Sequence, residues 1–213
     1  MPDSVDECAD TAALLGTAEK LPADGAARAS IARIESQLAV ERSLSLAGQW
    51  QGMRERLDAL LAEARSIGHD RTIALALREG SAILFVQART AEERQKYVQY
   101  LREALPLAAR AGDDRLAAWA ASTLFCTLAY RMHRIQEAEA MLPSVEALVI
   151  RGGDRPESQL EVWFGQARIL TQRRKFPEAI ALFERIIALS DGGSELWRTP
   201  GANARAEIGE IFM

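Results

Sequence analysis

Side chains able to perform acid–base, nucleophilic or metal chemistry are few in this sequence, and they are scattered. His69 and His133 are its only histidines. Each stands in an expected turn between helices, with no cysteine or carboxylate at a metal-ligand spacing. Cys126 lies in an apolar stretch, where a free cysteine behaves as a small hydrophobic side chain. We therefore predict surface positions for both histidines, a buried thiol at Cys126 and no metal site.

Glycine pairs and neighbouring carboxylates also fail to form a reactive pattern. The pairs at 152–153 and 192–193 follow no predicted strand and precede no Lys-Ser/Thr, so they indicate helix ends rather than a phosphate-binding loop. The glutamates at positions 92, 93, 137 and 139 stand at expected exposed turns and helix starts, whereas acid–base chemistry needs two carboxylates converging in a cleft. The sequence thus predicts a protein that is not an enzyme and holds no cofactor.

Composition favours a helical protein. Of the 213 residues, 48% are hydrophobic, 26% charged and only 6% aromatic, and Ala, Leu, Glu and Arg are strong helix formers. The net charge is −4 and charges of both signs are interspersed, which argues against nucleic acid as a partner. Charges interrupt every apolar run, so we expect no membrane-spanning segment. The first ten residues are acidic and polar and do not resemble a signal peptide.

A short glycine–aspartate motif recurs at intervals of about 40 residues, as expected of a helical repeat array. It consists of a glycine followed within two residues by an aspartate, at 68–70, 112–113 and 153–154. Glycine readily takes the left-handed conformation that ends a helix, and aspartate can cap the start of the next. We predict one helix ending and another beginning at each position.

The resulting fold class is all-α, a solenoid of about four antiparallel helix pairs with terminal helices. The short connections within each pair favour antiparallel packing. The predicted first helix carries an apolar stripe of Ile31, Ile34, Leu38 and Val40. A short helix and linker are expected over 1–26 and the repeat domain over 27–213, with pairs at 27–67, 71–111, 115–150 and 157–189 and a last helix at 203–212.

The fourth pair carries the pattern of a known repeat family. It has an early Trp, a small residue four positions later, an aromatic after the turn, and then Ala and an aromatic in the second helix: Trp163, Ala167, Leu170, Phe176, Ala179 and Phe183. This set resembles the tetratricopeptide repeat. Weaker versions occur at 134–138 and 48–50. The resemblance implies a right-handed solenoid whose first helices line a concave groove, with Trp163 largely buried.

A finer resemblance concerns the whole chain. The segment 6–10, the Ala/Arg-rich pairs and the junction 110–117 are similar to the C-terminal repeat region of large bacterial serine/threonine kinases of the myxobacterial type. The sequence lacks the kinase's Gly-rich loop, His-Arg-Asp and Asp-Phe-Gly motifs. The resemblance implies an interaction or sensory part of a signalling protein. Repeats of this kind also occur in bacterial transcription regulators, so the parent protein stays open.

The tetratricopeptide register places eight residues along the expected groove. They are Arg42, Arg89, Thr127, Tyr130, Arg131, Phe164, Arg168 and Gln172. The four arginines fall one per repeat, and a guanidinium pairs well with a carboxylate or phosphate. Two interpretations stand: a binding face for an acidic or phosphorylated segment, or ordinary solvated surface charges.

Our leading hypothesis is a non-catalytic, cytoplasmic domain that binds a protein or peptide. The alternative is a regulatory repeat domain that binds a small effector, as in transcription regulators. An open polar groove favours the first and an apolar pocket the second. The last helix has an apolar edge of Ile208, Ile211 and Phe212, so self-association through this end is a further hypothesis.

Overall fold

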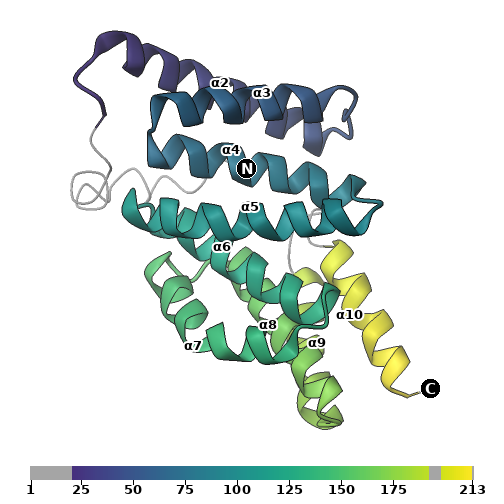
Figure 1. Cartoon of the computed structure of the whole chain (residues 1–213). Coiled ribbons are helices and arrows are strands. Elements are labelled where there is room, and N and C mark those ends of the chain that lie inside the picture. Colours follow the sequence, from purple (N-terminus) through teal and green to yellow (C-terminus); the bar gives the residue numbers. More distant parts are fainter. Residues whose placement is uncertain (1–20, 192–197, 213) are drawn as a thin grey trace. The chain divides into compact units, whose positions relative to one another are not determined.

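The computed structural model describes residues 21–191 and 198–212, and every regular element in these ranges is helical. The helix predicted within 1–26, Cys8, the segment 6–10 and the glycine pair 192–193 lie outside the described residues. The chain divides into two compact units, Met1–Ala117 and Ala118–Met213. Figure 1 shows the helices of each unit.

The first unit is built from helices that pack on their neighbours along the chain. These are α2 (Gly25–Leu46), α3 (Met53–Ile67), α4 (Asp70–Gln87) and α5 (Ala91–Arg110). Helix α4 is central, because it packs against α2, α3 and α5. Its residues Ala74, Ala76 and Leu77 have no solvent exposure. Small side chains at this centre allow close helix approach.

The second unit completes α6 and contains the remaining elements. They are α6 (Asp114–Cys126), the π-helical turn η2 (Thr127–Arg131), α7 (Ile135–Arg151), α8 (Pro156–Gln172), α9 (Phe176–Asp191) and α10 (Arg198–Ile211). Helix α8 packs against η2, α7, α9 and α10. Its core with α9 and α10 contains Ala167, Ala179, Phe183 and Ala204, all fully buried. The all-helical prediction is confirmed for the described residues.

The recurring glycines end helices as predicted. Gly68, Gly112 and Gly153 have φ values of 77°, 69° and 86°, a region that an L side chain rarely adopts. The predicted aspartate caps are right only at Asp113, whose Oδ1 accepts from the Leu116 N–H at 3.0 Å. Asp154 itself has a positive φ of 52°, so its backbone belongs to the turn rather than to a cap.

We predicted a surface position for His69, and this prediction is wrong. His69 is 5% exposed and stands at the N-cap of α4, where its Nδ1 accepts from the Thr72 N–H. Capping satisfies a backbone donor that would otherwise lack a partner. His133, in contrast, is exposed in a turn with φ 52°, as predicted.

Two details of the predicted core are wrong. Val40 is 55% exposed, and the next inward position after Leu38 belongs to Glu41, which is 6% exposed. The Glu41 carboxylate is neutralised by Arg56, with Nε and Oε1 2.5 Å apart. Trp163 is only partly buried, packed against the core of the second unit.

The starts of α3 and α10 have local causes in the residues at or just before their first turns. Helix α3 begins at Met53, and just before it the Trp50 indole donates to the Ser45 carbonyl at the end of α2, over 2.8 Å. Helix α10 begins at Arg198 rather than 203. Pro200 then lies in its first turn, where proline costs no helical hydrogen bond.

Candidate functional site

The eight predicted groove residues are divided between the two units. Arg42 is exposed on α2, and Arg89 is exposed in the connection between α4 and α5. The other six belong to the second unit, on η2 and α8. There Arg131 and Gln172 are exposed, and Thr127 is buried at 4% exposure. The remaining three lie together, half-buried: Tyr130, Phe164 and Arg168.

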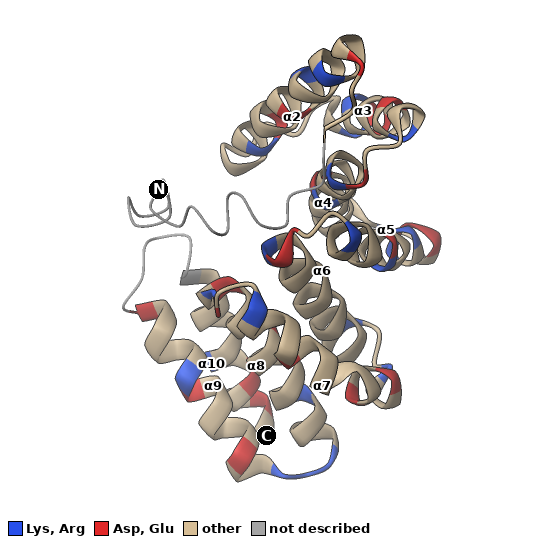
Figure 2. Cartoon of the chain, turned by 90° about the vertical axis from the view of Figure 1, so that its left-hand side faces the viewer, with Lys and Arg blue, Asp and Glu red and all other residues tan. Residues whose placement is uncertain are grey.

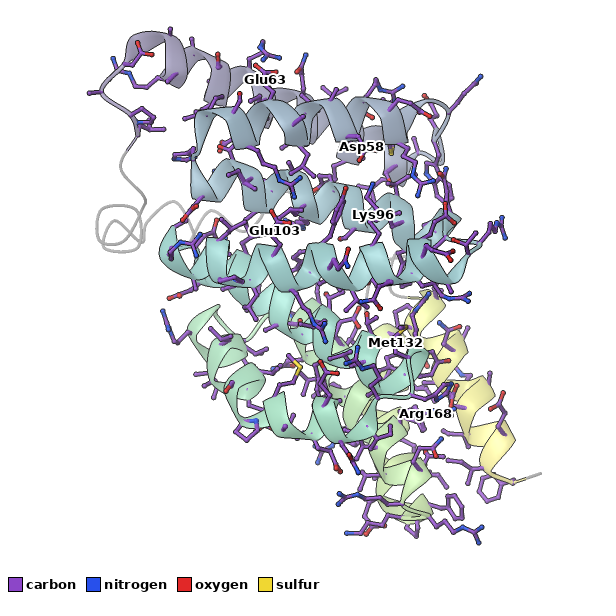
Figure 3. The ribbon with its side chains drawn as sticks, in the orientation of Figure 1. Asp58, Glu63, Lys96, Glu103, Met132 and Arg168 are labelled. Atoms are coloured by element: carbon purple, nitrogen blue, oxygen red, sulfur yellow. The ribbon has the colours of Figure 1, made fainter. Side chains whose placement is uncertain are left out.

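Tyr130 and Arg168 hold a carboxylate that was not among the predicted site residues. The Tyr130 hydroxyl donates to Oε1 of Glu207 on α10 over 2.7 Å. Nη1 of Arg168 donates to the other oxygen, Oε2, over 3.3 Å. Figure 3 shows Arg168 reaching from α8 toward α10. We call Tyr130, Phe164, Arg168 and Glu207 the carboxylate site.

Aromatic contacts fix the geometry of the carboxylate site. The Arg168 guanidinium carbon lies 5.8 Å from the centre of the Tyr130 ring, within cation–π range. Phe164 packs edge-to-face on Tyr130, with centroids 6.0 Å apart, and makes the same contact with Phe183 in the core. The phenol is thus held by a chain of rings that ends in a fully buried side chain.

The local backbone explains how Tyr130 reaches this position. The Met132 N–H bonds to the Thr127 carbonyl over 3.0 Å, which is a five-residue, π-type step. Such turns are rare and often occur at functional sites, because they rotate the following side chains relative to a regular α-helix. The turn η2 coincides with the predicted positions Thr127, Tyr130 and Arg131.

Burial shapes the electrostatics of the carboxylate site. Burial and the hydrogen bond to Glu207 raise the pKa of Tyr130 to about 12, so the phenol remains a donor at physiological pH. Glu207 is 8% exposed. The Nε of Arg168 is buried and has no hydrogen-bond partner among the described residues. The Glu207 carboxylate is thus held by one phenol donor and one guanidinium donor.

Glu207 could have been found from its helical spacing. Ala204, Ile208 and Ile211 occupy the buried or half-buried side of α10, and position 207 falls on the same side at i+3 from Ala204. A carboxylate on an otherwise apolar face needs a buried partner. The pattern therefore indicated that Glu207 forms an internal ion pair, but not which basic residue is its partner.

Cys126 lies close to the carboxylate site but is not activated. It is a free, partly buried thiol, and burial together with the neighbouring Glu161 raises its pKa well above the usual value. Burial also raises the pKa of Glu161, although the Cys126 thiol and Arg131 oppose that shift. Reactive cysteines have a lowered pKa, so the shift at Cys126 is in the direction opposite to that of an activated thiol.

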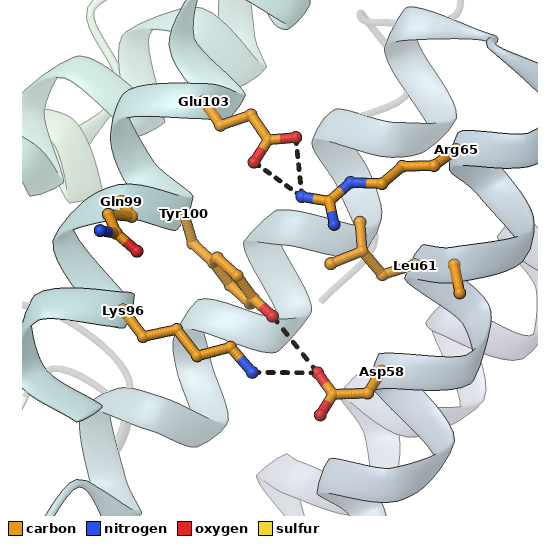
Figure 4. A pocket seen from close by; sticks show the side chains of 8 residues that line it. Asp58, Leu61, Arg65, Lys96, Gln99, Tyr100 and Glu103 are labelled. Carbon is orange, nitrogen blue, oxygen red and sulfur yellow. Dashed lines mark hydrogen bonds and ion pairs between the residues drawn. The ribbon is translucent and has the colours of Figure 1, made fainter. Parts of the chain in front are cut away.

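The first unit contains a separate polar groove of about 450 Å³ between α3 and α5. Figure 4 shows the Tyr100 hydroxyl and Lys96 Nζ converging on Oδ1 of Asp58, at 3.2 and 3.5 Å. Arg65 donates to both carboxylate oxygens of Glu103, at 2.8 and 2.7 Å. These charges already satisfy one another, so a ligand would have to displace internal ion pairs.

The residues of this groove were not predicted, although their spacing carries a signal. Asp58 and Arg65 recur at helical spacing on α3, and Lys96, Tyr100 and Glu103 do so on α5. Two polar stripes of complementary charge on neighbouring helices indicate ion pairs between them.

Arg42 has an electrostatic neighbour in the first unit. Burial raises the pKa of Glu79 on α4, and the nearby Arg78 and Arg42 oppose that shift. Arg78 Nε lies 3.8 Å from the Glu79 carboxylate, a long ion pair. The positive charge of Arg42 thus favours the ionised form of the Glu79 carboxyl.

Basic and acidic positions are mixed along the helices of each unit (Figure 2). Within 21–191 and 198–212, no three His, Cys, Asp or Glu side chains are grouped so that they could hold a metal ion. None of the helices in these ranges combines the length and apolarity needed to cross a bilayer.

Comparison with known proteins adds no relative. No family model, no curated protein and no solved structure matches this chain. Any assignment to a repeat family therefore depends on the residues themselves.

Proposed function

We propose that this chain is a non-catalytic helical-repeat domain of tetratricopeptide type that binds a protein or peptide through the carboxylate site. Its ligand presents a carboxylate or a phosphate. The observation that carries the proposal is that Tyr130 and Arg168 already hold a carboxylate from an element far away in the sequence. A site that binds one acidic side chain in its own chain has the chemistry to bind another.

Three further features support the proposal. Ala167, Ala179 and Phe183 are fully buried, as the family pattern requires of its small and aromatic positions. The turn η2 presents Tyr130 and Arg131. The groove of the first unit is lined mostly by charged and polar side chains that pair with one another, and it therefore lacks the apolar lining expected of a site for a small effector.

The wider setting belongs to the same proposal. We take the helices to pair as in a right-handed tetratricopeptide solenoid. The resemblance to bacterial kinase repeat regions suggests a cytoplasmic interaction part of a signalling protein.

The proposal can be tested by selecting peptides from a displayed random library on the intact chain. We expect enriched sequences to share an acidic residue at a fixed position, and their binding to weaken as salt rises. Tyr130→Phe and Arg168→Gln should each weaken the binding of a selected peptide by about tenfold or more, the loss expected for a hydrogen bond to a charged group.

The matched control is Arg185→Gln, because Arg185 is an exposed arginine on α9 of the same unit. Arg54 and Arg56 are unsuitable controls, since they pair with Glu93 and Glu41. Selected peptides without an acidic residue, or equal affinities in all three variants, would place the binding surface elsewhere.

A further inference from the structure

Helix α10 packs on the second unit through one face. Three residues at successive helical steps face the unit: Gly201, Ala204 and Glu207. A Cβ at Gly201 would lie 2.8 Å from the Ser190 Cβ on α9, so only glycine allows this approach. Ala204 is fully buried in the core. A helix with two small residues followed by a glutamate thus fits this surface.

The contact with α10 leaves the site incompletely satisfied. The Arg168–Glu207 distance of 3.3 Å is longer than the 2.7–2.9 Å of a strong charge-assisted hydrogen bond. Only Nη1 is used, while the buried Nε lacks a partner among the described residues. Glu207 makes a single contact with the guanidinium, whereas an acidic group that reached Nη2 together with Nη1 or Nε would form the bidentate pair that guanidinium prefers.

The outer side of α10 adds little to its attachment. Arg205 on α10 pairs with Asp191 at the end of α9, with Nη2 2.6 and 2.8 Å from the two oxygens. Both side chains are more than half exposed, and exposed ion pairs contribute little. Phe212, which follows the helix, is 76% exposed. Much of the specific polar attachment of α10 therefore resides in Glu207.

We infer that α10 is an internal copy of the ligand, and that a partner protein binds by placing an amphipathic helix with a small-x-x-small-x-x-Glu face where α10 lies. This inference rests on the proposed function and specifies the partner at the same site. Binding requires α10 to leave, so the apparent affinity is lowered by the fraction of molecules in which α10 stays docked. Helix α10 thus competes with the partner helix, and only a partner that binds more tightly than α10 or is present at high concentration displaces it.

The test uses the intact chain and a fluorescein-labelled peptide with the sequence of residues 198–212. Glu207→Gln weakens the internal helix, so this variant should bind the peptide about tenfold more tightly than the unchanged chain, the loss expected for a hydrogen bond to a charged group. The matched control is Glu210→Gln, which alters an exposed glutamate of the same helix and should bind the peptide as weakly as the unchanged chain. A peptide in which Glu207 is replaced by Gln should lose the gain.

A second variant guards against loss of folding in Glu207→Gln. Arg205→Gln removes the exposed ion pair to Asp191 without touching the carboxylate site, and it should raise peptide affinity in the same direction by a smaller factor. Light scattering should find both variants monomeric.

Equal peptide binding by the unchanged chain and by both loosened variants would overturn the inference and leave α10 as a fixed cap. So would dimerisation of the loosened variants without peptide binding, because α10 would then exchange between two copies. If selected library peptides still bind through Tyr130 and Arg168 in either case, the proposed function survives and only the displacement of α10 fails.

Discussion

Phe125 fills the space that a side chain at Gly165 would need. A Cβ built on Gly165, in the middle of α8, would lie 2.3 Å from Cε1 of the Phe125 ring. Phe125 has no solvent exposure, so its ring has little room to move. The absence of a side chain at position 165 therefore sets how closely α6 approaches α8, and with it the position of η2, which follows α6 directly.

We predict that Gly165→Ala destabilises the second unit. The overpacking costs roughly 1–3 kcal/mol, which outweighs the gain of about 0.5–1 kcal/mol that alanine brings to a helix interior. The control is Gly209→Ala, because a Cβ there meets nothing within 4 Å, and this change should be neutral or stabilising. Urea unfolding followed by circular dichroism measures both. A Gly165→Ala protein as stable as the parent would mean that the Phe125 ring relocates freely.

Ala179 offers a second test of packing. It is fully buried against the core of the second unit, so Ala179→Leu should lower the free energy of unfolding by roughly 1–3 kcal/mol. Ala181→Leu, two residues later on the exposed side of α9, should change it by less than about 0.5 kcal/mol. Thermal melts that shift equally for the two variants would contradict this assignment of the inner face.

Local signals allowed the helices to be predicted, while the carboxylate site depends on contacts that no local signal specifies. The ends at Gly68, Gly112 and Gly153 follow from the conformational freedom of glycine, which is a property of the residue itself. The Tyr130–Glu207 bond joins residues 77 positions apart. Spacing placed Tyr130, Phe164 and Arg168 on one expected face, but could not show that α10 brings a carboxylate to them.

The errors in the predicted core have the same origin. Val40 and Glu41 are neighbours, and apolarity alone favoured Val40 for the buried position. Glu41 is buried instead because Arg56, on the next helix, neutralises it. His69 was expected at the surface for a similar reason, since its cap contact with Thr72 becomes visible only once the start of α4 is known.

Stability at acidic pH should depend on Glu93. Its carboxylate pairs with Arg54 at 2.8 Å and accepts from the backbone N–H groups of Arg89 and Thr90. The Arg54 bond, followed by these backbone bonds, lowers the pKa of Glu93 to about 2. A lowered pKa in the folded state gives a stabilising contribution that is present above the ordinary pKa and is lost as the pH falls toward 2.

The measurement is a carbon-detected NMR titration of the Glu93 carboxyl, together with urea unfolding between pH 5 and 2.5. Arg54→Met should raise the pKa of Glu93 toward its usual value, and the stability difference between the parent and Glu93→Gln should shrink as the pH falls. An unshifted Glu93 titration near pH 4.5 would contradict the capping arrangement at the start of α5.

Tyr130 should be among the last of the three tyrosines to ionise. Its pKa of about 12 arises first from burial and then from the hydrogen bond to Glu207. Because the folded state raises this pKa, the contribution to stability is complete below pH 10, the ordinary tyrosine value, and is lost as the pH rises toward 12. Glu207→Gln removes the neighbouring negative charge and should lower the pKa of Tyr130, whereas Glu210→Gln should leave it unchanged.

NMR of tyrosine labelled at the ring carbon that carries the hydroxyl resolves each phenol, and Tyr130→Phe assigns the signal. A Tyr130 signal that ionises near pH 10 in the parent would show the phenol to be solvated in solution and α10 to be undocked, and the carboxylate site would then be open without any partner.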